Sequence, residues 1–151
     1  MVVMQLPSGN EILVVKVELP SSTPETVFDY WTRPSLIEQW WPPHAEVQPE
    51  VGGTYHFSWP TRNWHLRGVY TSFEPGKKLA FTWRWDHDPD DVMEREVAIV
   101  LEPLVNGGTS LVLTHGSYAN TKADQELRVD QHLIGWSHFM PILQDLLTTT
   151  E

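Results

Sequence analysis

The sequence has 151 residues, 40% of them hydrophobic and 20% charged, with 8 Trp, 12 Pro and no Cys. This length predicts one domain with its own core, and the lack of cysteine excludes disulfides, thiolate metal sites and a cysteine nucleophile. A net charge of −10 disfavours nucleic acid as a partner, and without a signal peptide or a long apolar run we expect no membrane insertion and a cytoplasmic location.

One strand and two short helices are predicted at the start of the chain. Residues 11–19 are rich in β-branched side chains, which is typical of a strand. Thr23 followed by Pro24 indicates a helix N-terminus, because the threonine side chain caps the helix and proline suits its first position. Pro34 begins a second helix, which we expect to end at the Pro42-Pro43 pair because proline cannot continue the hydrogen-bonding pattern.

A run of antiparallel strands is predicted between residues 45 and 117, where the hydrophobic period changes to two. Pro75-Gly76 suits the centre of a type II turn, and Asn106-Gly107 is a strong hairpin signal. The predicted strands cover residues 45–50, 54–59, 65–73, 78–85, 94–105 and 108–117, with an acidic loop at 86–91.

The last segment, residues 124–148, is predicted to form a long helix. Its apolar stripe has the spacing of three or four residues that one helix face requires. The members of this stripe are Val129, His132, Trp136, Phe139, Leu143 and Leu146. Pro141 removes one backbone hydrogen bond, so we expect a kink or a loosened turn near residues 137–141.

The order of elements predicts an α+β fold, with a curved antiparallel sheet of six to seven strands wrapped around the C-terminal helix. The final helix is the one element long enough to cover the apolar face of such a sheet. Where two curved layers stand apart in the middle, a cavity remains between them. We therefore look for function between sheet and helix.

Three parts of the sequence resemble one known family. They are residues 19–43, then Val51-Gly52-Gly53-Thr54-Tyr55 with residues 68–85, and finally residues 108–116 with Gly135-Trp136. Together they cover residues 11–147, nearly the whole of the single domain at 1–151. They are similar to the homologues of the activator of heat-shock protein 90 ATPase, which are START-like proteins of the SRPBCC superfamily. The resemblance implies the helix-grip fold, in which the sheet encloses an apolar ligand pocket.

Aromatic side chains on inward faces are the candidates for lining this pocket, because rings offer flat apolar surface to an aromatic ligand. They are Tyr55, Phe57, Trp59, Phe81, Trp83, Trp85, Trp136 and Phe139. Ordinary core packing is the alternative for each of them. Trp40 and Trp41, just before the proline pair, are candidates for the pocket rim or for scaffold contacts.

Two histidines are the polar candidates. His115 is in phase with Leu111 and Leu113 on a buried face, and His132 lies one turn before Trp136. An imidazole titrates near neutral pH, so either ring suits orienting a ligand or transferring a proton; a core histidine held by a backbone group is the alternative. The sequence shows no metal-ligand spacing and no nucleotide or phosphate motif, so we expect neither a metal nor a cofactor.

We expect a protein that binds a hydrophobic, aromatic or lipid-like small molecule rather than an enzyme. One alternative is an enzyme of the polyketide cyclase or hydrolase type, with His115 as its catalytic candidate. A second, implied by the resemblance, is an interaction module that acts with a chaperone in a stress response. A homodimer and a chaperone contact stay open as partners.

Overall fold

The computed structural model describes residues 4–6, 9–89 and 94–149, so Asp90 and Asp91 of the predicted acidic loop lie outside the described residues. Within those residues, eight antiparallel strands form one sheet in the order β1-β2-β8-β7-β6-β5-β4-β3. The strands are β1 (Met4–Leu6), β2 (Ile12–Leu19), β3 (His44–Val47), β4 (Thr54–Trp59), β5 (Trp64–Glu74), β6 (Lys78–Trp85), β7 (Arg95–Pro103) and β8 (Thr109–Gly116). The helices are α1 (Pro24–Thr32), α2 (Pro34–Ile37), α3 (Lys122–Glu126), the π-helical segment η1 (Leu127–Leu133) and α4 (Ile134–Thr149).

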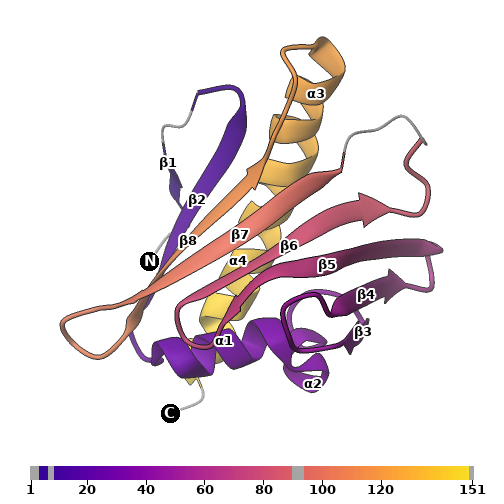
Figure 1. Cartoon of the computed structure of the whole chain (residues 1–151). Helices are drawn as coiled ribbons and strands as arrows, with labels where there is room; N and C mark the ends of the chain where they lie inside the picture. Colours follow the sequence, from indigo (N-terminus) through magenta and orange to yellow (C-terminus); the bar gives the residue numbers. More distant parts are fainter. Residues whose placement is uncertain (1–3, 7–8, 90–93, 150–151) are drawn as a thin grey trace.

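The predicted α+β helix-grip fold is confirmed. The sheet curves around the continuous run of α3, η1 and α4, while α1 and α2 close one end of the molecule (Figure 1). The sheet has more strands than the six to seven expected, because the short strand β1 pairs with β2 at its edge. Alternate residues of β2, β7 and β8 form the buried face against the helix: Leu13, Val15, Val17, Leu19, Val97, Ile99, Leu101, Leu111 and Leu113.

Local sequence signals fixed several boundaries. The side chain of Thr23 accepts a hydrogen bond from the backbone N–H of Thr26 at 3.3 Å, which caps α1 as predicted. Gly76 adopts a φ of +74° in the turn between β5 and β6, and Gly107 adopts +90° in the hairpin between β7 and β8. Both turns need this left-handed backbone, which glycine adopts without steric cost.

The second predicted helix is shorter than expected, because α2 ends at Ile37 rather than at the proline pair. The backbone N–H groups of Gln39 and Trp40 bond to carbonyls three residues back, which tightens the chain into turns before the prolines are reached. Trp40 is a scaffold residue, since its indole N–H donates to the carbonyl of Tyr30 at 2.8 Å.

The C-terminal helix is irregular at a different place from the one predicted. α4 continues as α-helix through Pro141, so the loosened turn that was one of the two expectations for residues 137–141 is wrong. The irregularity is η1, where the π-helical turns are wider than α-helical ones and change which residues face the sheet. Val129, predicted on the apolar stripe, is consequently 38% exposed.

Candidate ligand-binding site

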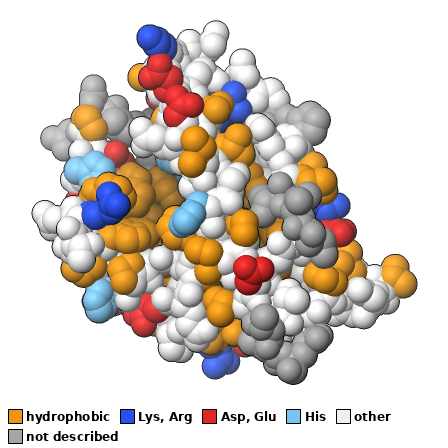
Figure 2. Space-filling view, turned by 180° about the vertical axis from the view of Figure 1, so that it is seen from behind, with side chains coloured by type: hydrophobic (Ala, Val, Ile, Leu, Met, Phe, Trp, Pro, Cys, Tyr) orange, Lys and Arg blue, Asp and Glu red, His pale blue; other side chains and the backbone are white. Residues whose placement is uncertain are grey.

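A cavity of about 410 Å³ lies between the sheet and the N-terminal part of the C-terminal helix. Figure 2 shows hydrophobic side chains gathered around a hollow on this face, with histidine and basic side chains beside it. Six tryptophans line the cavity: Trp41, Trp59, Trp64, Trp83, Trp85 and Trp136. The other lining residues are His87, Asp88, Arg95, Leu127, Gln131, His132, Gly135 and Phe139.

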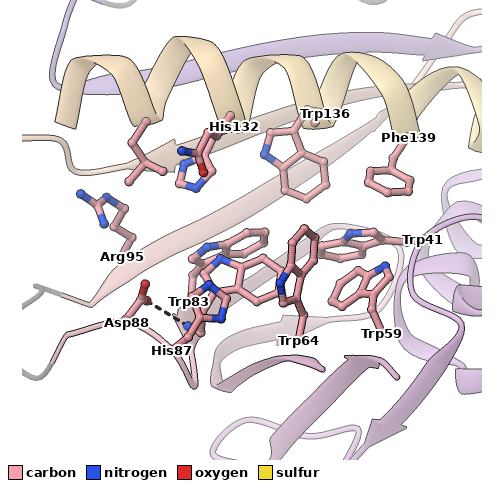
Figure 3. A pocket seen from close by; sticks show the side chains of 14 residues that line it. Trp41, Trp59, Trp64, Trp83, His87, Asp88, Arg95, His132, Trp136 and Phe139 are labelled. Atoms are coloured by element: carbon pink, nitrogen blue, oxygen red, sulfur yellow. Dashed lines mark hydrogen bonds between the residues drawn. The ribbon is translucent and has the colours of Figure 1, made fainter. Parts of the chain in front are cut away.

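The sheet and the helix supply opposite walls of this cavity. His132, Trp136 and Phe139 point from the helix toward the indoles of the strands, as Figure 3 shows. Trp83 on β6 stacks on Trp41 with ring centroids 6.0 Å apart, and Trp41 approaches Trp136 at 5.0 Å. These ring contacts join the two walls at the inner side of the cavity.

Rings nearer the surface form the outer part of the wall. Trp85 contacts Trp59 at 5.4 Å and Trp64 at 6.0 Å between centroids. Trp64 is 40% exposed, and the guanidinium carbon of Arg62 lies 4.9 Å from the centroid of its ring. Large apolar rings are therefore in contact with solvent at this end of the cavity.

Two histidines stack on each other beside the cavity, His115 on β8 and His132 on η1. The rings of His115 and His132 lie 4.2 Å apart and are nearly parallel, with an interplanar angle of 11°. The indole N–H of Trp136 donates to Nδ1 of His115 at 3.1 Å, and the hydroxyl of Tyr118 lies 2.7 Å from Nδ1 of His132. His115 therefore carries its proton on Nε2, a buried atom without a hydrogen-bond partner in the described part of the chain.

Burial keeps this histidine pair neutral. Desolvation lowers the pKa of His132 to about 3 and lowers that of His115 well below its usual value, and the positive charge of Arg95 adds to both effects. Desolvation also raises the pKa of Tyr118, so its hydroxyl keeps its proton within the 2.7 Å hydrogen bond that it shares with Nδ1 of His132.

Six of the predicted site residues line the cavity: Trp59, Trp83, Trp85, His132, Trp136 and Phe139. The other four do not. Tyr55, Phe57 and Phe81 face inward but pack against one another in the core, with Tyr55 at 4.7 Å from Phe57 and 5.2 Å from Phe81. Trp41 covers Phe57 at 5.1 Å. His115 is fully buried behind the wall.

Sequence reasoning missed Arg95 and Trp64 as lining residues. It left Trp41 open between the pocket rim and a scaffold contact, and Trp41 lies in the inner wall with 8% exposure. Arg95 is in phase with Val97 and Ile99, so the strand period indicated an inward side chain. Trp64 begins β5 directly after Asn63, whose φ is +53° in the preceding turn, and no pattern in the sequence fixed its direction.

Across residues 4–6, 9–89 and 94–149, no group of three or more His, Asp or Glu side chains is placed to hold a metal ion. None of the helices described there has the length and apolar character needed to cross a membrane.

A curved antiparallel sheet that grips a C-terminal helix, with a ring-lined cavity between them, defines the START-like class of helix-grip proteins. The family model for Activator of Hsp90 ATPase homolog 1-like proteins matches residues 21–148. The chain belongs to this family. A comparison with curated protein sequences gave no match.

Solved structures share the fold at low sequence identity. A protein from Mesorhizobium loti is 28% identical with a TM-score of 0.79, and the alignment covers 93% of this chain and 98% of that one. An HSP90 activator from Plasmodium falciparum is 19% identical with a TM-score of 0.72, covering 91% and 96%. DynU16, a protein of the dynemicin biosynthetic locus, is 21% identical with a TM-score of 0.77, covering 96% of this chain and 49% of that one.

Proposed function

We propose that this protein binds a small molecule with aromatic or other apolar rings in the cavity between the sheet and the C-terminal helix. The cavity volume of about 410 Å³ lies within the range of roughly 300–1,000 Å³ typical of ligand pockets. Removing apolar surface from water stabilises a complex by about 25 cal/mol per Å², from which the entropy lost by the ligand and the side chains on binding is subtracted. A flat ring system recovers this free energy best against indole walls.

One observation carries the proposal: six indole rings surround a hollow between the sheet and the C-terminal helix. Exposed or hollow-facing rings retain a hydration cost that core packing normally removes. Trp64 at 40% exposure is a large apolar side chain in such a position. A ligand that covers these rings removes that cost.

Gly135 provides a direct test. It lines the cavity on α4, and a Cβ atom built there meets nothing within 4 Å. In Gly135→Leu the new side chain enters the cavity, while leucine also favours the helix more than glycine does, so the fold is retained. Gly135→Ala is the matched control, because alanine fills little of the volume.

The measurement is quenching of tryptophan fluorescence by an anilinonaphthalene dye, followed by competition with naphthalene derivatives. We expect saturable binding to the wild type and to Gly135→Ala, and at least a ~10-fold weaker affinity, about 1.4 kcal/mol, for Gly135→Leu. Absence of saturable binding to the wild type contradicts the proposal. So does equal affinity in Gly135→Leu.

The enzyme alternative with His115 finds no support in the position of that ring. A general base must come within hydrogen-bond reach of the bound substrate. His115 is fully buried, lies against Trp83 at 4.6 Å between ring centroids, and accepts from Trp136 through Nδ1. Its contacts are those of a core histidine that supports the wall.

Contact with an Hsp90-type chaperone is the second candidate function, favoured by the family and by the likeness to an HSP90 activator. Titration calorimetry with purified chaperone tests it. If the chaperone surface is separate from the cavity, Gly135→Leu binds the chaperone as the wild type does. Absence of heat exchange with either protein rejects this function.

A further inference from the structure

We propose that the ligand carries an anionic oxygen group, such as a carboxylate, which pairs with the guanidinium of Arg95 at one end of the cavity. This inference rests on the proposed binding function and narrows it to aromatic or polycyclic acids. Figure 3 shows the geometry that supports it, with rings along the cavity and Arg95 at the end beside Asp88.

Arg95 is an unusual residue for its position. It begins β7 on the same face as Val97 and Ile99, pairs in register with Trp83 and is only 8% exposed. Burying a guanidinium is costly unless charge and hydrogen bonds compensate it. The neighbours of Arg95 therefore show how much of that compensation the protein itself supplies.

The protein satisfies this guanidinium only in part. Its Nη2 lies 3.1 Å from Oδ2 of Asp124, an oxygen that also accepts the backbone N–H of Ala119 at 2.7 Å. The guanidinium carbon of Arg95 lies 5.1 Å from the ring centroid of Tyr118, a cation–π contact. Its Nε is buried without a hydrogen-bond partner among the described residues. An arginine has five N–H donors, so capacity is left for an acceptor.

The other charged or titratable lining residues do not compete for this role. Asp88 is the acidic residue of the wall, and its Oδ2 accepts the backbone N–H of Trp85 at 3.0 Å. His132 is neutral, because burial lowers its pKa to about 3, and His87 is exposed at the surface. Within the described wall, Arg95 is the permanent cation.

A second nitrogen donor lies beside Arg95. The indole N–H of Trp83, the residue that pairs in register with Arg95, is buried without a partner in the described chain. Unpaired buried donors are rare in folded proteins. An unpaired indole N–H beside a buried arginine favours a ligand oxygen, and a carboxylate matches the fork of arginine donors better than a neutral group does.

The test compares naphthoate with naphthamide, which have the same rings and nearly the same shape but differ in charge. We expect the wild type to bind naphthoate at least ~10-fold more tightly than naphthamide, a difference of about 1.4 kcal/mol. Arg95→Met removes this preference, so naphthoate and naphthamide bind to that variant with similar affinity. Arg95→Lys retains part of it, because lysine keeps the charge without the fork.

Asp124→Asn separates the proposed role from a structural one. It removes the carboxylate that competes for Arg95 while an amide oxygen still accepts from Ala119, so naphthoate binding becomes several-fold stronger and naphthamide binding does not change. A merely structural ion pair predicts weaker binding of both compounds. This variant keeps the inference falsifiable if Arg95→Met fails to fold.

The outcomes distinguish the two proposals. Equal affinity for naphthoate and naphthamide in the wild type, with no change of their ratio in Asp124→Asn, overturns the carboxylate inference while ring binding in the cavity stands. Failure of both compounds to bind the wild type overturns both proposals. A naphthoate preference that survives in Arg95→Met also overturns the role given to Arg95.

Discussion

The two ends of the C-terminal helix pack on the same sheet with different results. Toward its C-terminus, Met140, Leu143 and Leu147 are at most 2% exposed against the sheet. Toward its N-terminus, Trp136 meets Trp41 and Trp83 at 5.0 and 5.8 Å, and a cavity remains beside them. Layers of one fold therefore close or stay open according to the side chains between them.

Side-chain shape explains this difference. Flexible or branched aliphatic side chains interdigitate and fill irregular gaps, as native cores require. Indole rings are large and rigid and contact one another at fixed edge or tilted angles, so they hold two layers apart. The closed end supplies stability, and the open end supplies a binding surface. The following measurements test that division.

Truncation at the closed end has the largest expected effect on stability. Leu143→Ala removes a fully buried side chain, so we expect the free energy of unfolding to fall by about 2–5 kcal/mol in urea denaturation. Phe139→Ala is the comparison at the open end, where the ring faces the cavity and is only partly buried. Its loss should stay near ~1 kcal/mol. Equal losses for the two variants contradict the division.

Lowering the pH should destabilise the protein through the two neutral histidines at the open end. In the unfolded chain a histidine has a pKa of about 6.5, whereas in the folded chain the pKa of His132 is lowered to about 3 and that of His115 is also lowered. Below pH 6.5 the unfolded state therefore binds more protons than the folded state, and stability falls as the pH falls. The slope reaches up to about 1.4 kcal/mol per pH unit for each histidine.

Urea denaturation between pH 7 and pH 4 measures this slope. His132→Gln removes one of the two groups and keeps an acceptor for the hydroxyl of Tyr118, so its slope should be shallower than that of the wild type. Identical slopes for the two proteins would show that another group controls acid stability.

The smallest effect concerns the helix backbone beside the cavity. Gly135→Ala should stabilise the protein by about 0.5–1 kcal/mol, because alanine loses less backbone entropy in a helix and its Cβ enters open space. Thermal unfolding with and without bound dye measures it. A destabilised variant would mean that the space beside Gly135 is narrower than the structure has it.

Much of the closed end could be predicted from the sequence, because period-two strands and a helical stripe each specify one buried face. The cavity could not be predicted in the same way. Tyr55 and Trp83 share an inward face, yet only Trp83 lines the hollow, because the region of Tyr55 is covered by tertiary contacts such as that of Trp41 with Phe57. Local patterns carry no information about such contacts between distant segments.

Arg95 shows a second limit on what the sequence can predict about the site. Its phase with Val97 already indicated an inward side chain, but whether an inward arginine is neutralised or left with spare donors depends on Asp124, a residue on the following helix. Charge compensation across elements is a property of the assembled fold. The sequence therefore predicted a pocket lined by rings and did not predict its charged end.

The π-helical segment gives the chain a place where its length can change at little structural cost. η1 spans seven residues ahead of α4, and α4 is anchored on the sheet by the side chains that follow. A π-helical turn holds about one residue more than an α-helical turn, so loss of a single residue from η1 would let the segment close into α-helix while α3 and α4 keep nearly the same faces toward the sheet. Such a deletion would move only residues of η1 itself, among them Leu127, Gln131 and His132 of the cavity wall, and would reshape that wall while the six indoles stay in place.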